Sequence, residues 1–187
     1  MAMALLAGTL LALAGFLLTS VQGFAVAAHL AATAPAAKLL VTKHVAYAIP
    51  TVLLSLFSQS MVIFFFVGTG RLVKDEVAGF PDADRRVVLG ALRGFKRKTS
   101  PPATFALLSA IAVFVLGGAV HTGALPTWVH LAASIAAVGT HAWAFVAEWA
   151  AFLENTRLME DPAAFVRRRP VAVPRQGAAG GVPRSLP

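Results

Sequence analysis

The sequence predicts an all-α integral membrane protein in which four transmembrane helices form one bundle. Of its 187 residues, 58% are hydrophobic and only 13% are charged, and the mean hydropathy is +0.75, well above that of a water-soluble domain. Four long apolar segments are separated by short polar connections. A repeat within the chain predicts that two similar helical hairpins, in parallel orientation, build the bundle.

The repeat relates the stretch from His44 to Asp75 to the stretch from His130 to Asp161 without a gap. His44 falls on His130, Asp75 falls on Asp161, and an Arg-Leu pair at 71–72 falls on one at 157–158. The preceding helices match only weakly, through GFAV at 23–26 and GGAV at 117–120. Both hairpins enter from the same side, so we expect a pseudo-twofold axis along the membrane normal.

Composition excludes several classes of function. The chain has no cysteine, which rules out disulfides, thiolate metal sites, a thiol nucleophile and covalent haem attachment. Its net charge of +8 comes from basic residues in a loop and a tail that flank uncharged segments. This placement predicts contact with anionic lipid headgroups and no nucleic-acid partner.

We expect the first helix over about residues 4–32, retained in the mature protein, because its apolar run exceeds the roughly 7–15 residues of a signal sequence. Gly8, Gly15 and Gly23 recur at about two-turn intervals, which favours close helix contact in lipid. Pro35 is expected to break the chain before a second helix over about residues 44–70.

The segment at about 83–98 is predicted to be a separate amphipathic helix on the cytoplasmic side. Val88, Leu92 and Phe95 fall on one face, and a basic face suited to the lipid interface comprises Arg85, Arg86, Arg93, Lys96, Arg97 and Lys98. The alternative is a helix solvated by the cytoplasm. The third and fourth helices are expected over about 103–122 and 127–158. Residues 1–161 then form one membrane domain, and the basic tail 162–187 is expected to be disordered.

Lys and Arg counts predict the orientation. Eight lie between the second and third helices and six after the fourth, against two in the first connection and none in the third. Both termini are therefore expected in the cytoplasm of a bacterial-type inner membrane. Trp128 and Trp149 are spaced by roughly 31 Å along a helix, close to the thickness of a bilayer core, and are expected near its two interfaces.

Histidines and polar side chains are the candidate functional residues. His29, His44, His121 and His130 all lie at predicted helix ends on the outer side, and His141 is deeper. Helix four has polar residues at seven-residue spacing, and helix two has a shorter set; both polar stripes are expected to face inward. The stripes comprise Thr127, Ser134, His141, Glu148 and Asn155 on helix four, and His44, Thr51 and Ser58 on helix two, with Ser55 and Gln59 beside the latter.

Four hypotheses fit these residues. In the first, His44 and His130 hold a b-type haem between helices two and four, with His141 as a further candidate ligand at a deeper level. In the second, outer histidines including His29 and His121 bind copper or zinc. The third is a proton or ion path along helix four. The fourth gives the polar groups a purely structural role in helix association.

Function is predicted less specifically than fold. No phosphate-binding loop, zinc-protease motif or nucleophile motif occurs in the sequence, and no large soluble domain is expected. We therefore expect a small subunit or scaffold of a larger membrane assembly rather than an enzyme by itself, with membrane lipids and other membrane subunits as partners. Electron transfer through haem is the most specific hypothesis, and a small transporter is the alternative.

Overall fold

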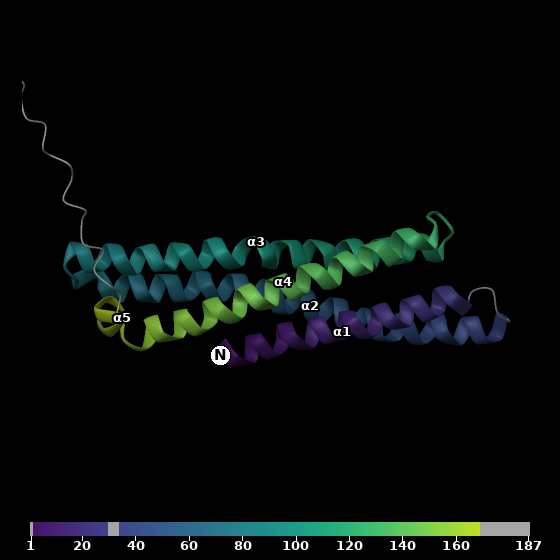
Figure 1. Cartoon of the computed structure of the whole chain (residues 1–187), viewed down its shortest axis with the longest axis horizontal. Coiled ribbons are helices and arrows are strands. Elements are labelled where there is room, and N and C mark those ends of the chain that lie inside the picture. Colours follow the sequence, from purple (N-terminus) through teal and green to yellow (C-terminus); the bar gives the residue numbers. More distant parts are fainter. Residues whose placement is uncertain (1, 30–33, 169–187) are drawn as a thin grey trace, which may run out of the picture.

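The computed structural model describes residues 2–29 and 34–168, and helices make up nearly all of this part of the chain (Figure 1). Four long helices, each long and apolar enough to cross a membrane, confirm the predicted all-α class and number of spans. In chain order the elements are α1 (Ala2–His29), α2 (Ala34–Glu76), the 3-10 turn η1 (Val77–Gly79), α3 (Asp82–His121), α4 (Thr127–Glu160) and α5 (Pro162–Arg168).

The long helices run alternately up and down and form a square in cross-section. Each of α1, α2 and α3 packs against the next helix in the chain, and α4 closes the square against α1. Helices α2 and α4 therefore lie across a diagonal and run in the same direction (Figure 1). Their inward side chains approach one another at the centre of the bundle.

The buried face of α4 shows how the sequence specifies this packing. Its buried positions alternate in steps of three and four residues, which is the spacing of helices that interlock at a shallow crossing angle. Small residues alternate with polar ones along this face, so the helices approach closely around a polar interior. The positions are Ser134, Ala137, His141, Ala144, Glu148, Ala151, Asn155 and Leu158, and Phe152 is buried beside them.

Glycines on α1 allow a close approach to α2. A Cβ atom added to any of the three would fall on a polar α2 side chain at short distance: Gly8 at 2.9 Å from Ser58 Oγ, Gly15 at 2.7 Å from Thr51 Oγ1, and Gly23 at 3.4 Å from His44 Cε1. Because lipid provides no hydrophobic drive for helix association, this backbone proximity is what holds the first hairpin together.

Helix α3 departs from the predicted pattern. The amphipathic segment at 83–98 is not a separate interfacial helix, because α3 continues from it through Pro101 and Pro102 to His121. A single buried stripe at three- and four-residue spacing runs through Pro102, while Pro101 is exposed. The stripe comprises Val88, Leu92, Phe95, Thr99, Pro102, Ala106, Ala110 and Val113.

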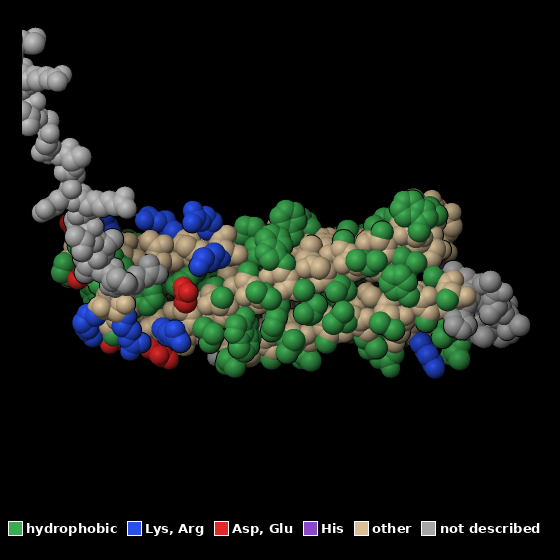
Figure 2. All heavy atoms as spheres, viewed as in Figure 1, with side chains coloured by type: hydrophobic (Ala, Val, Ile, Leu, Met, Phe, Trp, Pro, Cys, Tyr) green, Lys and Arg blue, Asp and Glu red, His purple; other side chains and the backbone are tan. Residues whose placement is uncertain are grey.

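The apolar face of this segment has a protein partner rather than lipid. Val88, Leu92 and Phe95 share a buried cluster with Val73 at the end of α2 and Leu158 at the end of α4. Charged side chains gather at this end of the bundle, and hydrophobic side chains cover most of the remaining surface in the same view (Figure 2). Of the six predicted interfacial cations, five are exposed and Lys96 is half-buried.

The start of α2 also differs from the prediction. Pro35 does not break the chain but lies in the first turn of α2, where the missing N–H costs no helical hydrogen bond. His44 therefore lies ten residues inside the helix instead of at its boundary. Pro50 is accommodated within α2, as membrane helices allow.

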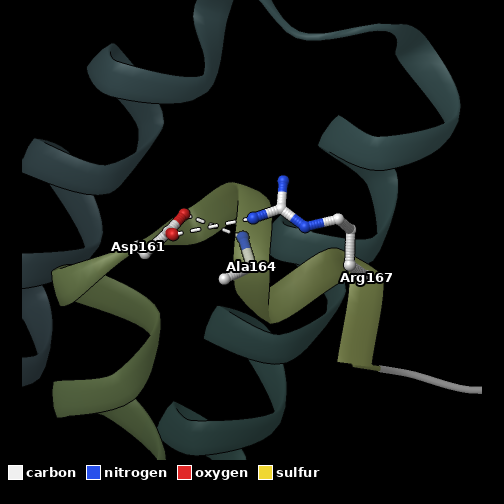
Figure 3. A network of polar contacts seen from close by, with 3 residues as sticks. All are labelled: Asp161, Ala164 and Arg167. Atoms are coloured by element: carbon white, nitrogen blue, oxygen red, sulfur yellow. Dashed lines mark hydrogen bonds and ion pairs between the residues drawn. The ribbon is translucent and has the colours of Figure 1, made fainter.

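The first residues after α4 are helical, whereas the sequence suggested a disordered tail from 162. Asp161 caps α5 by accepting a hydrogen bond from the Ala164 N–H at 2.7 Å, and its other oxygen lies 3.8 Å from Arg167 Nη2 (Figure 3). Pro162 occupies the first helical position, which it favours. The rest of the predicted tail, 169–187, lies outside the described residues.

The α1–α2 contact gives a matched pair of substitutions. Gly15→Ala should destabilise the protein by roughly 1–3 kcal/mol, because the new Cβ overlaps the branched Thr51 side chain and forces the helices apart. Gly139→Ala meets no atom within 4 Å and should be neutral or stabilising by up to about 1 kcal/mol. Unfolding in mixed detergent micelles measures both. Equal effects of the two substitutions would contradict close α1–α2 packing.

Candidate functional site

Two histidines face one another across the centre of the bundle near the end that carries the α3–α4 turn. The ring centroids of His44 on α2 and His130 on α4 are 6.1 Å apart, with an angle of 81° between the ring planes. Both side chains are half-buried. Both Nδ1 atoms are buried and make no hydrogen bond within the described part of the chain. The pair is thus enclosed but not bonded to protein groups at these atoms.

Each histidine lies against a glycine of the preceding helix. A Cβ atom on Gly23 of α1 would lie 3.4 Å from His44 Cε1, and one on Gly117 of α3 would lie 3.0 Å from His130 Cε1. The carbonyl of Thr19, four residues before Gly23, is near the His44 ring. The carbonyl of Val113, four residues before Gly117, is near the His130 ring. The two hairpins therefore surround their histidines in the same way.

A cavity of about 610 Å³ includes this histidine pair. All four long helices contribute to its lining, which is mainly apolar: examples are Phe16, Val52, Val113 and Leu131. His121, at the end of α3, is also part of the lining. A mainly apolar cavity with two inward imidazoles suits a flat, largely hydrophobic cofactor whose metal ion binds nitrogen atoms.

His141 is a different kind of site from the outer pair. Its Nδ1 is 2.7 Å from the carbonyl oxygen of Ala137, and its Nε2 is 2.6 Å from Ser55 Oγ. A carbonyl can only accept, so Nδ1 carries the hydrogen and the Ser55 hydroxyl donates to Nε2. The Phe16 ring packs on it at a centroid distance of 4.3 Å. With both nitrogens engaged, His141 is not available as a haem ligand.

Seven residues further along α4, Glu148 is completely buried. Thr9 on α1 and Gln59 on α2 face its carboxyl group. Neither oxygen of Glu148 has a hydrogen bond of ordinary geometry among the described residues, and the same holds for Gln59 Oε1. This layer therefore contains acceptor oxygens with no donor.

The next polar layer joins Asn155 and Thr69. Asn155 Nδ2 donates to Thr69 Oγ1 at 3.4 Å and to Met159 Sδ at 3.5 Å, and Asn155 Oδ1 has no partner among the described residues. Ser134, the outermost member of the predicted stripe, is buried and its hydroxyl donates to the Leu131 carbonyl. The polar stripes of α2 and α4 thus form the centre of the bundle.

Contacts across the diagonal join residues 86 positions apart in the sequence. This holds for His44 with His130, for Ser55 with His141 and for Thr69 with Asn155. The same offset relates the two stretches of the sequence repeat. Residues that the repeat makes equivalent therefore meet near the bundle axis at three depths.

The predicted outer metal site is not assembled in the described residues. His121 is exposed, and the side chain of His29 lies outside the described residues. Among side chains that the structure describes, no three His, Cys, Asp or Glu residues come close enough to hold a metal ion. The copper or zinc hypothesis therefore has no supporting geometry here.

Sequence reasoning missed the contribution of α1 to these layers. Thr9 faces Glu148, Phe16 packs on His141, and Gly23 lies against His44. The signal was present as a seven-residue spacing from 9 to 16 to 23, but Thr9 and Phe16 are unremarkable in an apolar helix. Their role becomes clear only from the residues of α2 and α4 that lie at the same depth in the bundle.

The chain matches no protein-family model, no curated protein and no solved structure. Its function must therefore be inferred from this geometry.

The hydrogen-bond pattern of His141 predicts one tautomer. Selective ¹⁵N labelling should show hydrogen on Nδ1, because that atom donates to the Ala137 carbonyl. Ser55→Ala should shift the Nε2 resonance and leave Nδ1 protonated, while the exposed His121 serves as the control and should not change. A hydrogen on Nε2 in the wild-type protein would contradict the assigned direction of the Ser55 bond.

Proposed function

We propose that this protein is a membrane-embedded subunit that holds one b-type haem between α2 and α4 for electron transfer. The observation that supports it best is the His44–His130 pair, which comes from two separate helices and faces a single mainly apolar cavity. Neutral imidazole is a strong ligand of haem iron, and helical bundles hold such cofactors between facing helices.

The dimensions fit this ligand. Metal–imidazole bonds of roughly 2 Å on each side, together with the distance from nitrogen to ring centre, span about 6 Å. The observed centroid separation is 6.1 Å, which is close to this span, so His44 and His130 are the residues that would hold the iron. The cavity of about 610 Å³ lies within the usual size range of cofactor sites.

Neighbouring residues orient the two imidazoles and leave room beside them. The carbonyls of Thr19 and Val113 lie near the ring of the adjacent histidine, where they can orient it and direct the other nitrogen toward the cavity. Gly23 and Gly117 leave room beside the rings. Haem, when bound, supplies one-electron chemistry; the protein residues bind it, fix the ligand orientation and exclude water.

Helix position supports this proposal. His44 was expected at the boundary of a helix, where a haem ligand is poorly fixed, but α2 begins ten residues earlier. The backbone on both sides of His44 is therefore helical and rigid. His130 follows the start of α4 by three residues, so the two ligands differ in their distance from the helix ends although they share one depth.

The remaining parts of the proposal concern assembly and location. The described residues lie almost wholly in the four-helix bundle, which supports a role as a subunit that exchanges electrons with other membrane proteins. The agreement of the 86-residue offset with the three diagonal contacts supports an origin by duplication of a helical hairpin. Basic residues at the end where α2 leads into α3 favour a bacterial-type inner membrane with that end in the cytoplasm.

A small transporter or proton path is the alternative function. It depends on residues deeper than the haem cavity, namely His141, Glu148 and Asn155. The bonds of His141 to Ser55 and Ala137 interrupt a continuous path at that level. A proton path would require these bonds to break, whereas the haem proposal leaves them in place. We prefer the haem proposal for this reason.

Absorbance spectroscopy tests the haem proposal directly. The protein purified with haem present should show a Soret band and, after reduction with dithionite, a sharp α band. His44→Ala and His130→Ala should each lose the α band, because each removes one of two axial nitrogens. A colourless wild-type protein would refute the proposal.

The matched control is His121→Ala, which changes a histidine of the same cavity lining that does not face the pair. Its spectrum should equal that of the wild type. Loss of the α band in this variant as well would show that His44 and His130 are not the specific ligands. Secondary structure measured by circular dichroism in every variant separates haem loss from unfolding.

Reporter fusions test the proposed orientation. A fluorescent protein fused to the C-terminus should fluoresce, because this end is expected in the cytoplasm. Alkaline phosphatase inserted in the turn between α3 and α4, at residues 123–125, should be active because that turn is expected outside. The opposite pair of results would reverse the assigned orientation.

A further inference from the structure

The deepest polar layer of the bundle contains an acidic side chain that the haem proposal does not use. The structure describes all eight acidic residues of the chain, and Glu148 alone among them is buried. Its exposed fraction is 0%. As expected for a member of the inward polar stripe, Glu148 points into the bundle, while the neighbouring Trp149 lies on the outer surface of α4, 44% exposed.

Within residues 2–29 and 34–168, no charged group pairs with this carboxyl. The ion pairs within the described residues, Arg85 with Asp82 and Arg167 with Asp161, do not include it. The side chains that face it, Thr9 from α1 and Gln59 from α2, are uncharged. The buried stripe of α3 also contains no charged residue, and the nearest titratable group on α4's own inward face is His141, seven residues away.

A bare carboxylate in this setting is very unfavourable. Moving an isolated charge into a membrane interior costs several kcal/mol or more, and unpaired buried acceptor oxygens add to the cost. Among the described residues, neither oxygen of Glu148 nor Gln59 Oε1 makes a hydrogen bond of ordinary geometry. A cation from solvent removes both problems at once, because it cancels the charge and occupies the acceptors.

We propose that Glu148 is a proton-binding site inside the bundle, exchanging its proton with the charged end through Asn155 and Thr69. A proton is favoured over a divalent metal because Glu148 is the one carboxylate here, and the described residues offer no group of three His, Cys, Asp or Glu side chains. Proton binding converts the carboxylate to a carboxylic acid, whose O–H donates to Gln59 Oε1 or Thr9 Oγ1. Atoms and charge balance without any further reactant.

The route follows from which polar groups are free. Toward the outer side, both ring nitrogens of His141 are engaged by Ser55 and by the Ala137 carbonyl. Toward the charged end, Asn155 has an Oδ1 without a partner among the described residues and only a long 3.4 Å bond to Thr69, whose hydroxyl donates to the Phe65 carbonyl at 2.9 Å. A water molecule or a side-chain rotation bridges the remaining gap more easily on this side.

Infrared spectroscopy of the purified protein in lipid at neutral pH tests the site. The carbonyl stretch of a protonated carboxylic acid should be present in the wild type and absent in Glu148→Gln. It should persist in Glu160→Gln, which changes an exposed glutamate of the same helix. Absence of this band from the wild type overturns the proposal whether or not the variants fold, as does a band that survives in folded Glu148→Gln.

A second comparison separates a proton from a sodium ion. Thermal stability should be equal in sodium chloride and choline chloride at the same ionic strength. A sodium-specific stabilisation that disappears in Glu148→Gln would identify Na⁺ as the occupant and overturn the assignment of a proton. Both outcomes are independent of haem, since Glu148 lies away from His44 and His130 along the bundle.

The exchange route has its own test. On transfer to deuterated water, the carbonyl band should shift as the proton is replaced. Asn155→Leu should slow this shift at least several-fold, whereas Ser134→Ala, on the outer side of His141, should leave its rate unchanged. A slower shift in Ser134→Ala but not in Asn155→Leu would place the route on the outer side and overturn the proposed one.

Discussion

The structure depends on one constraint: polar side chains of a membrane bundle must be placed away from lipid and given partners inside. Helices α2 and α4 carry most of these side chains, and they lie across the diagonal of the square. Only this arrangement brings both polar stripes to the same central axis. Helices α1 and α3 then fill the other corners with glycine, alanine and threonine, which allow close approach.

Equivalent residues meet at the axis, so a feature present in both hairpins is doubled there. Two histidines become a facing pair, and each is accompanied by a glycine of its own hairpin. A polar residue found in only one hairpin faces a residue of a different type in the other. His141 meets Ser55 and is satisfied by it, whereas Glu148 is offset from Val62 by the same 86 residues and gains no donor from it. The outer layer is thus symmetric and open, and the deeper layers are asymmetric.

The sequence predicted the class of fold and the inward direction of the polar stripes because both follow from simple rules of period and hydrophobicity. It did not predict that α3 continues through Pro101 and Pro102, because the stripe that carries it depends on partners near Val73 and Leu158 that lie far away in the chain. It also placed His44 at a helix end, because Pro35 was expected to end a helix. In the structure Pro35 lies in the first turn of α2.

The histidine pair illustrates what sequence alone leaves open. Equivalence under the repeat predicted that His44 and His130 share a depth, but sharing a depth does not decide whether two side chains face lipid, each other or different neighbours. The diagonal placement of α2 and α4 decides it, and α1 and α3 enclose the pair. The sequence could not predict the hydrogen bonding of the oxygens around Glu148 either, since it depends on Thr9 and Gln59 from two other helices. Chemistry in this chain therefore arises where three or four helices meet, and the spacing along any one helix shows only which face takes part.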